Sequence, residues 1–243
     1  MKDLYTESRH LLETALPQLQ PTLVEGLFAR YFPRHLRVVG DGGRVASMLF
    51  SIPYAVQTER GTIPARYLFG IATDPAYRGQ GLAKGLIEDE VKRGFPVFLH
   101  PRTPSLFAFY EKAGLLPLSP VVTEVGRAEA ASLPTLPQAL TAERYLACRR
   151  RYLTEPFVAP DEAFLSLCSD GALALPDECV ALYRREGDKI LFTEWLGNVD
   201  FAPRLAAYLG AERFELRRYA AKGTPFGVGT GLPADTAFLL SLM

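Results

Sequence analysis

The most informative stretch of this sequence is residues 73–83, which read Thr-Asp-Pro-Ala-Tyr-Arg-Gly-Gln-Gly-Leu-Ala. A β-rich run at residues 65–73 leads into it, and the apolar pattern at residues 82–93 predicts an amphipathic helix after it. The first N–H groups of a helix have no intrahelical partner and lie at the positive end of its dipole. Because Gly79 and Gly81 let a ligand approach this backbone closely, the stretch predicts a binding site for a phosphate or pyrophosphate.

The loop at residues 78–83 differs from the two common nucleotide-binding loops. A P-loop would place lysine and then serine or threonine directly after its second glycine, whereas Leu82 follows Gly81 here. A dinucleotide-binding fold would carry the pattern G-x-G-x-x-G, with an acidic residue about twenty positions later. A phosphate site of another kind is therefore expected.

Two segments carry a resemblance to a known family. Residues 78–83, Arg-Gly-Gln-Gly-Leu-Ala, resemble the Arg/Gln-x-x-Gly-x-Gly/Ala signature of the GCN5-related N-acetyltransferase (GNAT) superfamily, and residues 71–77 resemble the strand end and turn before it. Residues 106–115, Leu-Phe-Ala-Phe-Tyr-Glu-Lys-Ala-Gly-Leu, resemble its second signature, a tyrosine-containing helix that ends in Lys-x-Gly-Phe, with leucine in place of the final aromatic residue. Both signatures occur in the expected order, about 30 residues apart, which is far more specific than a lone glycine-rich turn.

The resemblance implies a cofactor and a place for each of its parts. Acetyl-CoA would bind with its pyrophosphate on the backbone amides of residues 79–83 and with its pantetheine arm beside residues 71–73, like an added strand. Tyr110 occupies the general-acid position of the family, where its hydroxyl would protonate the departing CoA thiolate. Thr103 and Ser105 stand where the family often has an asparagine. The implied cofactor-binding residues are Ile71, Ala72, Thr73, Arg78, Gly79, Gln80, Gly81, Leu82, Ala83, Thr103 and Ser105.

Two halves with a similar order of elements are predicted along the chain. The first, residues 1–127, is the expected acetyl-CoA-binding GNAT domain, with two helices, a hairpin, a strand, the loop and its helix, a buried strand and a short helix. Residues 128–140 are rich in proline and alanine and are typical of a linker. Residues 141–243 repeat the order in reduced form, which indicates a degenerate repeat.

This arrangement resembles the two-GNAT-domain acetyltransferases of the enhanced-intracellular-survival (Eis) type, without their sterol-carrier-like domain. It implies an α/β (α+β) GNAT fold, in which helices flank a central mixed, mostly antiparallel twisted sheet, followed by a smaller degenerate GNAT-like domain. The second half is expected to have no cofactor loop, because residues 196–200 lack the arginine and the paired small residues that a pyrophosphate needs. Residues 227–231, Gly-Val-Gly-Thr-Gly, precede a proline rather than a helical pattern and are expected to form a surface turn.

The base that would activate the acceptor amine stays open at this stage. Glu59, His100, Glu124 and Glu194 each have suitable chemistry, although a solvated or paired role is the more ordinary one for each. Some Eis-type proteins use the terminal carboxylate of the chain in the active site. Met243 is therefore a further candidate catalytic residue.

Composition argues against several classes of function. The 27 basic and 27 acidic side chains balance, which disfavours binding to nucleic acid or to an anionic membrane surface. The sequence has no run of ~20 apolar residues that could cross a bilayer, and its charged N-terminal segment is unlike a signal peptide, so a cytoplasmic location is expected. Cys148, Cys168 and Cys179 form no C-x-x-C pair and are expected to be reduced and structural, and the spacing of the histidines predicts no metal site.

Together these observations predict an acetyl-CoA-dependent N-acetyltransferase that transfers an acetyl group directly to a primary amine. The alternative is a CoA-binding regulatory or scaffold protein that keeps the fold without catalysis. Small amines, aminoglycosides, polyamines, amino acids and peptide or protein lysines all stay open as acceptors, because a fold does not fix a substrate. The apolar segment at residues 236–242 is expected to form a strand that could pair within the chain or with a second copy, so a homo-oligomer is one assembly that the sequence allows.

Overall fold

The computed structural model describes residues 3–154 and 156–239. The elements predicted from the sequence in the first half agree with it in type, whereas the strand at residues 116–127 was not predicted. In chain order the elements are α1 (Leu4–Ala15), α2 (Pro21–Tyr31), β1 (Leu36–Asp41), β2 (Arg44–Thr58), β3 (Gly61–Thr73), η1 (Pro75–Tyr77), α3 (Leu82–Lys92), β4 (Val97–Leu99), α4 (Ser105–Glu111), β5 (Leu116–Arg127), β6 (Gln138–Leu140), α5 (Ala142–Arg149), β7 (Phe157–Ala159), α6 (Glu162–Cys168), β8 (Gly171–Leu175), β9 (Cys179–Glu186), β10 (Lys189–Gly197), η2 (Val199–Phe201), α7 (Ala202–Tyr208), β11 (Arg213–Tyr219) and β12 (Thr224–Thr230).

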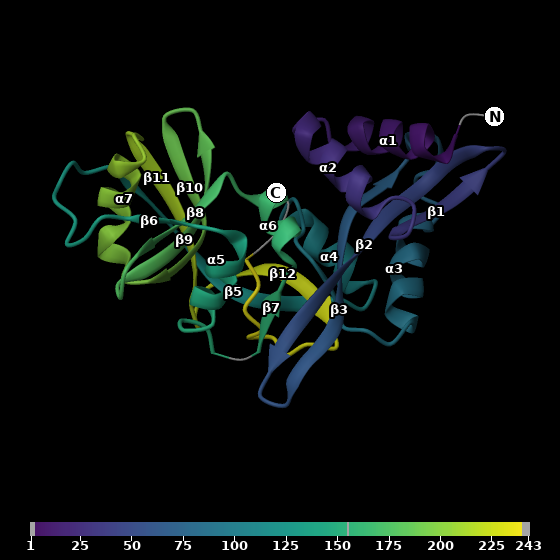
Figure 1. The fold of residues 1–243 in the computed structure, drawn as a ribbon. Helices are drawn as coiled ribbons and strands as arrows, with labels where there is room; N and C mark the ends of the chain where they lie inside the picture. Colours follow the sequence, from purple (N-terminus) through teal and green to yellow (C-terminus); the bar gives the residue numbers. More distant parts are fainter. Residues whose placement is uncertain (1–2, 155, 240–243) are drawn as a thin grey trace.

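The strands of the described residues join into one continuous sheet. Their order is β1-β2-β3-β4-β12-β5-β11-β10-β9-β8-β6, and β7 pairs with the distal part of β2. Most neighbours are antiparallel, whereas β3–β4 and β10–β11 are parallel. The mixed, mostly antiparallel sheet flanked by helices that the sequence predicts is therefore confirmed (Figure 1).

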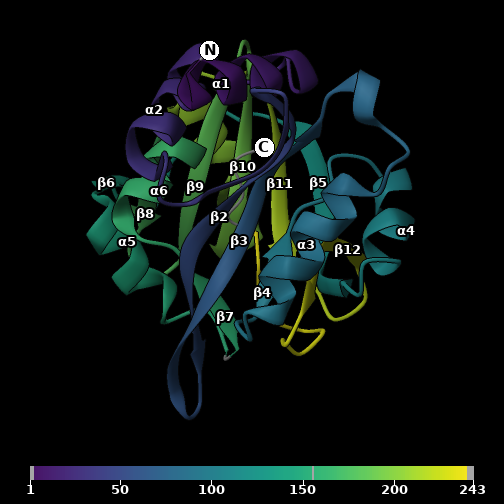
Figure 2. The same ribbon diagram turned by 90° about the vertical axis from the view of Figure 1, so that its right-hand side faces the viewer.

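Helices cover both faces of the sheet around β2. Residues 45–52 of this strand are all buried, although successive side chains point to opposite faces. On one side α1 contacts β2 and β3, and on the other α3 contacts β1, β2 and β3 (Figures 1 and 2). Asp3 caps α1 by accepting a hydrogen bond from the Tyr5 amide, and Pro21 occupies the first turn of α2, where its missing N–H costs nothing.

The second half repeats the order of the first. Three antiparallel strands, β8, β9 and β10, are followed by a short 3-10 helix, the helix α7 and the strand β11, which is parallel to β10. The corresponding series in the first half is β1, β2, β3, η1, α3 and β4. Helices α5 and α6 precede the second series as α1 and α2 precede the first, with the short strand β7 between them.

The last strand, β12, lies within the part of the sheet built by the first half, with β5 between it and β11. It pairs with β4 on one side and with β5 on the other, antiparallel to both. The expectation of a surface turn at residues 227–231 is therefore wrong for Gly227 and Gly229, which lie inside this strand. A Cβ at Gly227 would lie 2.8 Å from the carbonyl oxygen of Leu99, so glycine is needed here for close strand packing and not for a turn.

The segment that follows β12 packs into the core beside this part of the sheet. Ala237 forms an isolated bridge with Phe157, and Phe238 is fully buried against Phe98 at a ring-centroid distance of 4.8 Å. The hydroxyl of Ser119 donates to the carbonyl of Phe238 and accepts from its amide. A strand was expected at residues 236–242, but the described part of this segment forms only the single bridge at Ala237. Residues 236–239 are buried against other parts of the same chain.

Candidate active site

Strands β3 and β4 run side by side over only two residue pairs. Arg66 pairs with Val97 and Tyr67 with Phe98, after which β3 continues to Thr73 while the chain leaves β4. On its other edge β3 stays paired with β2 as far as Thr73. Beyond Tyr67, no described strand pairs with the edge of β3 that faces β4. Its backbone groups can therefore pair with an extended ligand.

β3 has a bulge close to the point where it separates from β4. Gly70 and Ile71 lie opposite Leu49 alone, so β3 carries one extra residue at this point. Gly70 has a φ of +62°, and a Cβ there would lie 2.8 Å from the Leu12 side chain. An extra residue bends a strand and increases its twist, which turns the end of β3 away from β4.

The end of β3 is held by short polar contacts to β2. The buried hydroxyl of Ser47 donates to the Ala72 carbonyl at 3.0 Å and lies 2.9 Å from the Thr73 hydroxyl. Asp74 then accepts a hydrogen bond from the Ala76 amide, which starts η1. These contacts fix the direction in which the chain enters the glycine loop.

The glycine loop lies on the surface between β3 and α3. Gly79 and Gly81 have φ values of +78° and +76°, and a Cβ at either would meet no neighbour, so backbone conformation is the structural reason for glycine here. Gly81 is the N-cap residue of α3, and no side chain caps this end of the helix. Arg78 and Gln80 are exposed, whereas Leu82 and Ala83 are partly buried in the first turn of α3. The arrangement presents uncapped amides to an anion.

Tyr110 lies in α4, the helix that follows β4. Its side chain is buried to 7% exposure, and its hydroxyl forms no hydrogen bond to a described residue. Burial raises the pKa of this phenol from 10.0 to about 12, because the charged phenolate loses its solvation. The group is therefore protonated at neutral pH. Nearby, Thr103 and Ser105 are exposed and hydrogen-bonded to each other at 2.9 Å.

His100 comes directly after β4. Its Nδ1 lies 2.5 Å from the Phe226 carbonyl, and its ring stacks on the Phe226 ring with centroids 4.0 Å apart. Burial lowers the pKa of His100 to about 4, partly offset by the hydrogen bond to Phe226. The imidazole is therefore neutral at pH 7, with Nδ1 the donor to the carbonyl and Nε2 left as an acceptor.

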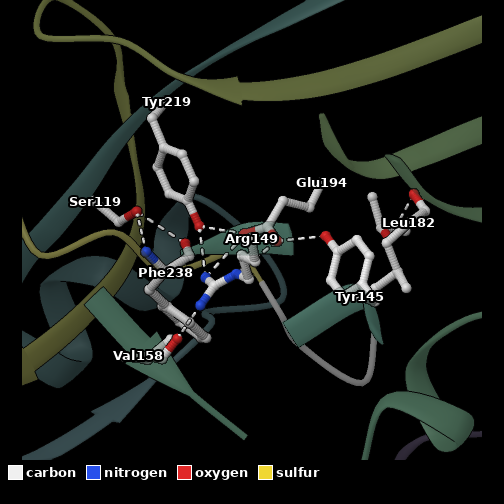
Figure 3. A network of polar contacts seen from close by, with 9 residues as sticks. Ser119, Tyr145, Arg149, Val158, Leu182, Glu194, Tyr219 and Phe238 are labelled. Atoms are coloured by element: carbon white, nitrogen blue, oxygen red, sulfur yellow. Dashed lines mark hydrogen bonds and ion pairs between the residues drawn. The ribbon is translucent and has the colours of Figure 1, made fainter. Parts of the chain in front are cut away.

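Two of the candidate bases are held in ion pairs. Glu124 pairs with Arg218 at 2.7 Å, and the fully buried Glu194 accepts hydrogen bonds from Arg149, Tyr145 and Tyr219 (Figure 3). Burial alone would raise the pKa of Glu194, but the Arg149 charge outweighs it and lowers that pKa below its usual value. Glu194 is thus a structural anion.

The two remaining candidates are not placed in the site. Glu59 is exposed in the β2–β3 turn, and Met243 lies outside the described residues.

The Glu194 network lies where β10 and β11 separate in the second half. This place corresponds to the separation of β3 and β4 in the first half. The last β10–β11 pair is Phe192–Leu216, and β10 carries its own bulge directly afterwards. Beyond that pair, the Tyr219 hydroxyl donates to Glu194 at 2.6 Å and so connects β11 to β10. The second divergence is therefore bridged by side chains, whereas the first has a free strand edge.

Other kinds of site find less support in the described residues. They contain no group of three or more His, Cys, Asp or Glu side chains that could hold a metal ion. Cys148 and Cys179 are free thiols, and burial raises the pKa of Cys179 to about 12, which disfavours a reactive thiolate. No helix in the described part of the chain is long and apolar enough to span a membrane.

The diverging parallel strands, the bulge and the glycine loop before α3 define the GNAT class of acetyltransferase folds. Residues 2–115, a little under half of the chain, match the model of the family described as acetyltransferase (GNAT) domain. A search of curated protein sequences gave no match.

Solved structures extend the similarity to nearly the whole chain. A probable N-acyltransferase from Enterococcus faecalis V583 is similar over 94% of this chain and 70% of its own, with a TM-score of 0.72 and 15% identity. A GCN5-related N-acetyltransferase from Anabaena variabilis is similar over 92% and 69%, with a TM-score of 0.67 and 14% identity. Eis1 from Mycobacterium abscessus is similar over 95% and 69%, with a TM-score of 0.59 and 14% identity. At these identities the similarity establishes a shared fold.

Sequence reasoning missed two residues that shape this site. Gly70 forms the bulge, and a lone glycine inside a strand pattern is a signal for one. Ser47 fixes the end of β3 from the neighbouring strand, and nothing in the local sequence marks this contact.

Proposed function

We propose that the protein is an acetyl-CoA-dependent N-acetyltransferase that transfers the acetyl group directly to a primary amine. One observation carries the proposal: the unpaired edge of β3 leads from the bulge at Gly70 straight to the uncapped glycine loop at the start of α3. A strand edge and a helix N-terminus in series suit a ligand with an amide-containing arm and a pyrophosphate, which is the chemistry of CoA.

The chain offers a distinct group for each part of the cofactor. The backbone amides of residues 79–83 would hold the pyrophosphate, with Arg78 and Gln80 exposed beside them. Ile71, Ala72 and Thr73 would pair with the pantetheine arm, because their edge of β3 has no strand partner among the described residues. Ser105 begins α4 and Thr103 lies two residues before it, and the hydroxyl of either would donate to an amide carbonyl of the arm.

Tyr110 is the proposed general acid. When bound, acetyl-CoA supplies an activated thioester. Tyr110 holds a proton on its hydroxyl at neutral pH and would deliver it to the departing sulfur, while backbone N–H groups on the free edge of β3 would donate to the acetyl carbonyl. The attacking amine would lose its proton to a carboxylate or to water.

The proposal assigns the cofactor to the first half alone. In the second half, Glu194, Tyr219 and Arg149 bridge the divergence that would otherwise admit a pantetheine arm. The segment between β10 and α7 also lacks the arginine and paired small residues of the first loop.

A titration of acetyl-CoA and CoA against the wild type and Gly81→Glu tests this proposal. The new carboxylate would repel the pyrophosphate at the start of α3, so we expect binding to the wild type and its loss in the variant. A thiol-release screen over an amine panel then tests catalysis. Binding without release for any amine would favour the CoA-binding regulatory protein, and absence of binding would refute both functions.

A further inference from the structure

A large cavity adjoins α4 on the side of the sheet formed by β5, β11 and β12. Its volume is about 1000 Å³, and the connection between β4 and α4 forms one of its walls. The residues that determine its chemistry are His100, Arg102, Phe107, Arg217, Lys222 and Phe226. These side chains come from segments more than 100 residues apart in the sequence, so no local motif announces the cavity.

Positive charge dominates the cavity wall. Arg102, Arg217 and Lys222 line it, against the single carboxylate of Glu111. Arg217 lies 3.4 Å from Glu215 and 5.9 Å from the centre of the Phe226 ring, so it is partly compensated. Arg102 and Lys222 are exposed and form no ion pair with a described residue. Two cations that face one cavity and form no ion pair within the described part of the chain favour an anionic ligand.

The neutral ring of His100 forms a flat, uncharged part of the wall. It is stacked on Phe226 and fixed through Nδ1 to the Phe226 carbonyl. Because its pKa is lowered to about 4, this ring adds no charge to the cavity at neutral pH. The attraction for an anion therefore comes from the arginines and the lysine, and the stacked rings offer an apolar surface beside them.

The cavity wall begins at His100, close in sequence to the last residue pair between β3 and β4. His100 lies two residues after Phe98, which makes the last β3–β4 pair. In the proposed binding mode the pyrophosphate lies at residues 79–83 and the arm runs back along β3 from Thr73 toward that closed end. The six residues from Leu68 to Thr73 span about 20 Å of strand. The acetyl end of the cofactor would then arrive beside the segment that begins with His100.

We propose that this cavity receives the acceptor and that Arg102, Arg217 and Lys222 select amines that also carry an anionic group, a carboxylate or a phosphate. The inference rests on the proposed acetyltransferase function and deepens it by naming a substrate class. An uncharged amine end reaches toward the thioester, while the anionic group pairs with the guanidinium and ammonium groups. A polycationic acceptor would meet like charge in the same place.

Steady-state kinetics with matched amines tests the proposal. The panel pairs 4-aminobutyrate with butylamine, which lacks the carboxylate, and phosphoethanolamine with ethanolamine, and it adds putrescine as a diamine without an anionic group. We expect kcat/KM to be highest for an anionic member, and Arg217→Gln or Lys222→Gln to raise its KM by about 10-fold with kcat little changed, since a charge-assisted hydrogen bond is lost. Lys222→Glu should reverse the preference toward putrescine. Lys92→Gln, at a 72% exposed position in α3 outside the cavity wall, is the control for loss of a positive charge.

The outcomes separate this inference from the function on which it rests. Equal kcat/KM for the members with and without the anionic group in both pairs, or a preference for putrescine in the wild type, overturns the selection of anions. Weaker acetyl-CoA binding in Lys222→Gln and Arg217→Gln also overturns it, because the cavity would then hold a cofactor phosphate. Absence of thiol release with every amine defeats the proposed function instead. Calorimetric titration with 4-aminobutyrate and phosphoethanolamine then tests whether the cavity binds anions: binding that is lost in Lys222→Gln supports an anion site, and absence of binding refutes it.

Discussion

Arg149 donates to both carboxylate oxygens of Glu194, from Nε at 2.7 Å and from Nη2 at 3.0 Å, and neither side chain is more than 1% exposed. The same guanidinium donates to the Val158 carbonyl of β7, the short strand that pairs with β2. The pair therefore joins α5 and β10 to a strand that rests on the first half of the chain. Burial disfavours each charge alone, so each side chain depends on the other.

Loss of Arg149 should be strongly destabilising. Arg149→Met leaves the Glu194 carboxylate buried without its cation, for which we expect a loss of about 3–5 kcal/mol in the free energy of unfolding. Urea unfolding followed by circular dichroism measures this loss. Arg213→Met removes an arginine from the exposed pair with Asp188 and should cost far less, because solvent screens an exposed pair. Similar losses in the two variants would contradict a structural role for the buried pair. The double variant Arg149→Met/Glu194→Leu should be more stable than Arg149→Met, because no unpaired charge is left.

Gly79 should be required for cofactor binding through its backbone conformation. Gly79→Ala places a Cβ at a φ of +78°, which disfavours the loop conformation by about 1 kcal/mol or more and moves the amides that would face the pyrophosphate. We expect weaker acetyl-CoA binding in a calorimetric titration. Gly85→Ala is the matched control, because Gly85 lies within α3 with open space around its Cβ position. It should stabilise the protein by about 0.5–1 kcal/mol and leave binding unchanged. Equal effects on binding would argue against a pyrophosphate site in the loop.

Replacement of Gly70 in the bulge should lower both the stability of the protein and its affinity for acetyl-CoA. Gly70→Ala combines a φ of +62° with a Cβ only 2.8 Å from Leu12, so we expect a loss of about 1–3 kcal/mol and weaker acetyl-CoA binding. The double variant Gly70→Ala/Leu12→Ala removes the contact but not the strained φ. If the bulge directs β3 away from β4, the double variant should still bind acetyl-CoA more weakly than Leu12→Ala alone. Restored binding would assign the effect to the Leu12 contact alone.

Tyr110 should act through its hydroxyl. Tyr110→Phe removes the proton donor but keeps the buried ring, so we expect turnover to fall by about 10²-fold or more while acetyl-CoA affinity stays the same. Because burial raises the pKa of Tyr110 to about 12, the wild type should keep this acid protonated through pH 10, where an ordinary tyrosine is half ionised. Thiol-release rates from pH 7 to 10 measure both effects. Tyr208→Phe, at a 49% exposed position in α7, is the control, and unchanged turnover in Tyr110→Phe would remove the hydroxyl from the mechanism.

The sequence predicted best what local chemistry determines. The helix patterns, the hairpin at Gly42–Gly43 and the loop at residues 78–83 depend on neighbours a few positions away, and the structure has these elements where the sequence placed them. By contrast, β12 depends on β4 and β5, more than 90 residues earlier, and its glycines suit that close packing while they resemble a turn in isolation. Short strands such as β7 have too few residues for a periodic signal.

In the candidate site, too, the parts that depend on local sequence were predicted and the parts that depend on distant strands were not. The two motifs led to the glycine loop and to Tyr110, because each motif lies on one continuous segment. The cavity with Arg217 and Lys222 could not be predicted in this way, since β11 and β12 reach it only through the order of strands in the sheet. The role of Glu194 likewise became clear only from its three partners on α5 and β11.

His100 should make the protein less stable as the pH falls. Its pKa is about 4 in the folded protein, against a reference value of 6.5 for the unfolded chain, so between these values the unfolded state binds a proton that the folded state does not. The free energy of unfolding should therefore be highest above pH 6.5 and decline toward pH 4, with this residue responsible for as much as about 3 kcal/mol of the decline. His100→Gln removes the titrating ring, so the difference between wild type and variant should shrink as the pH is lowered from 7.5 to 5 in urea unfolding experiments. His10→Gln, at an exposed position in α1, is the matched histidine replacement. A difference between wild type and His100→Gln that is constant over this pH range would show that the folded environment of His100 does not disfavour its charge.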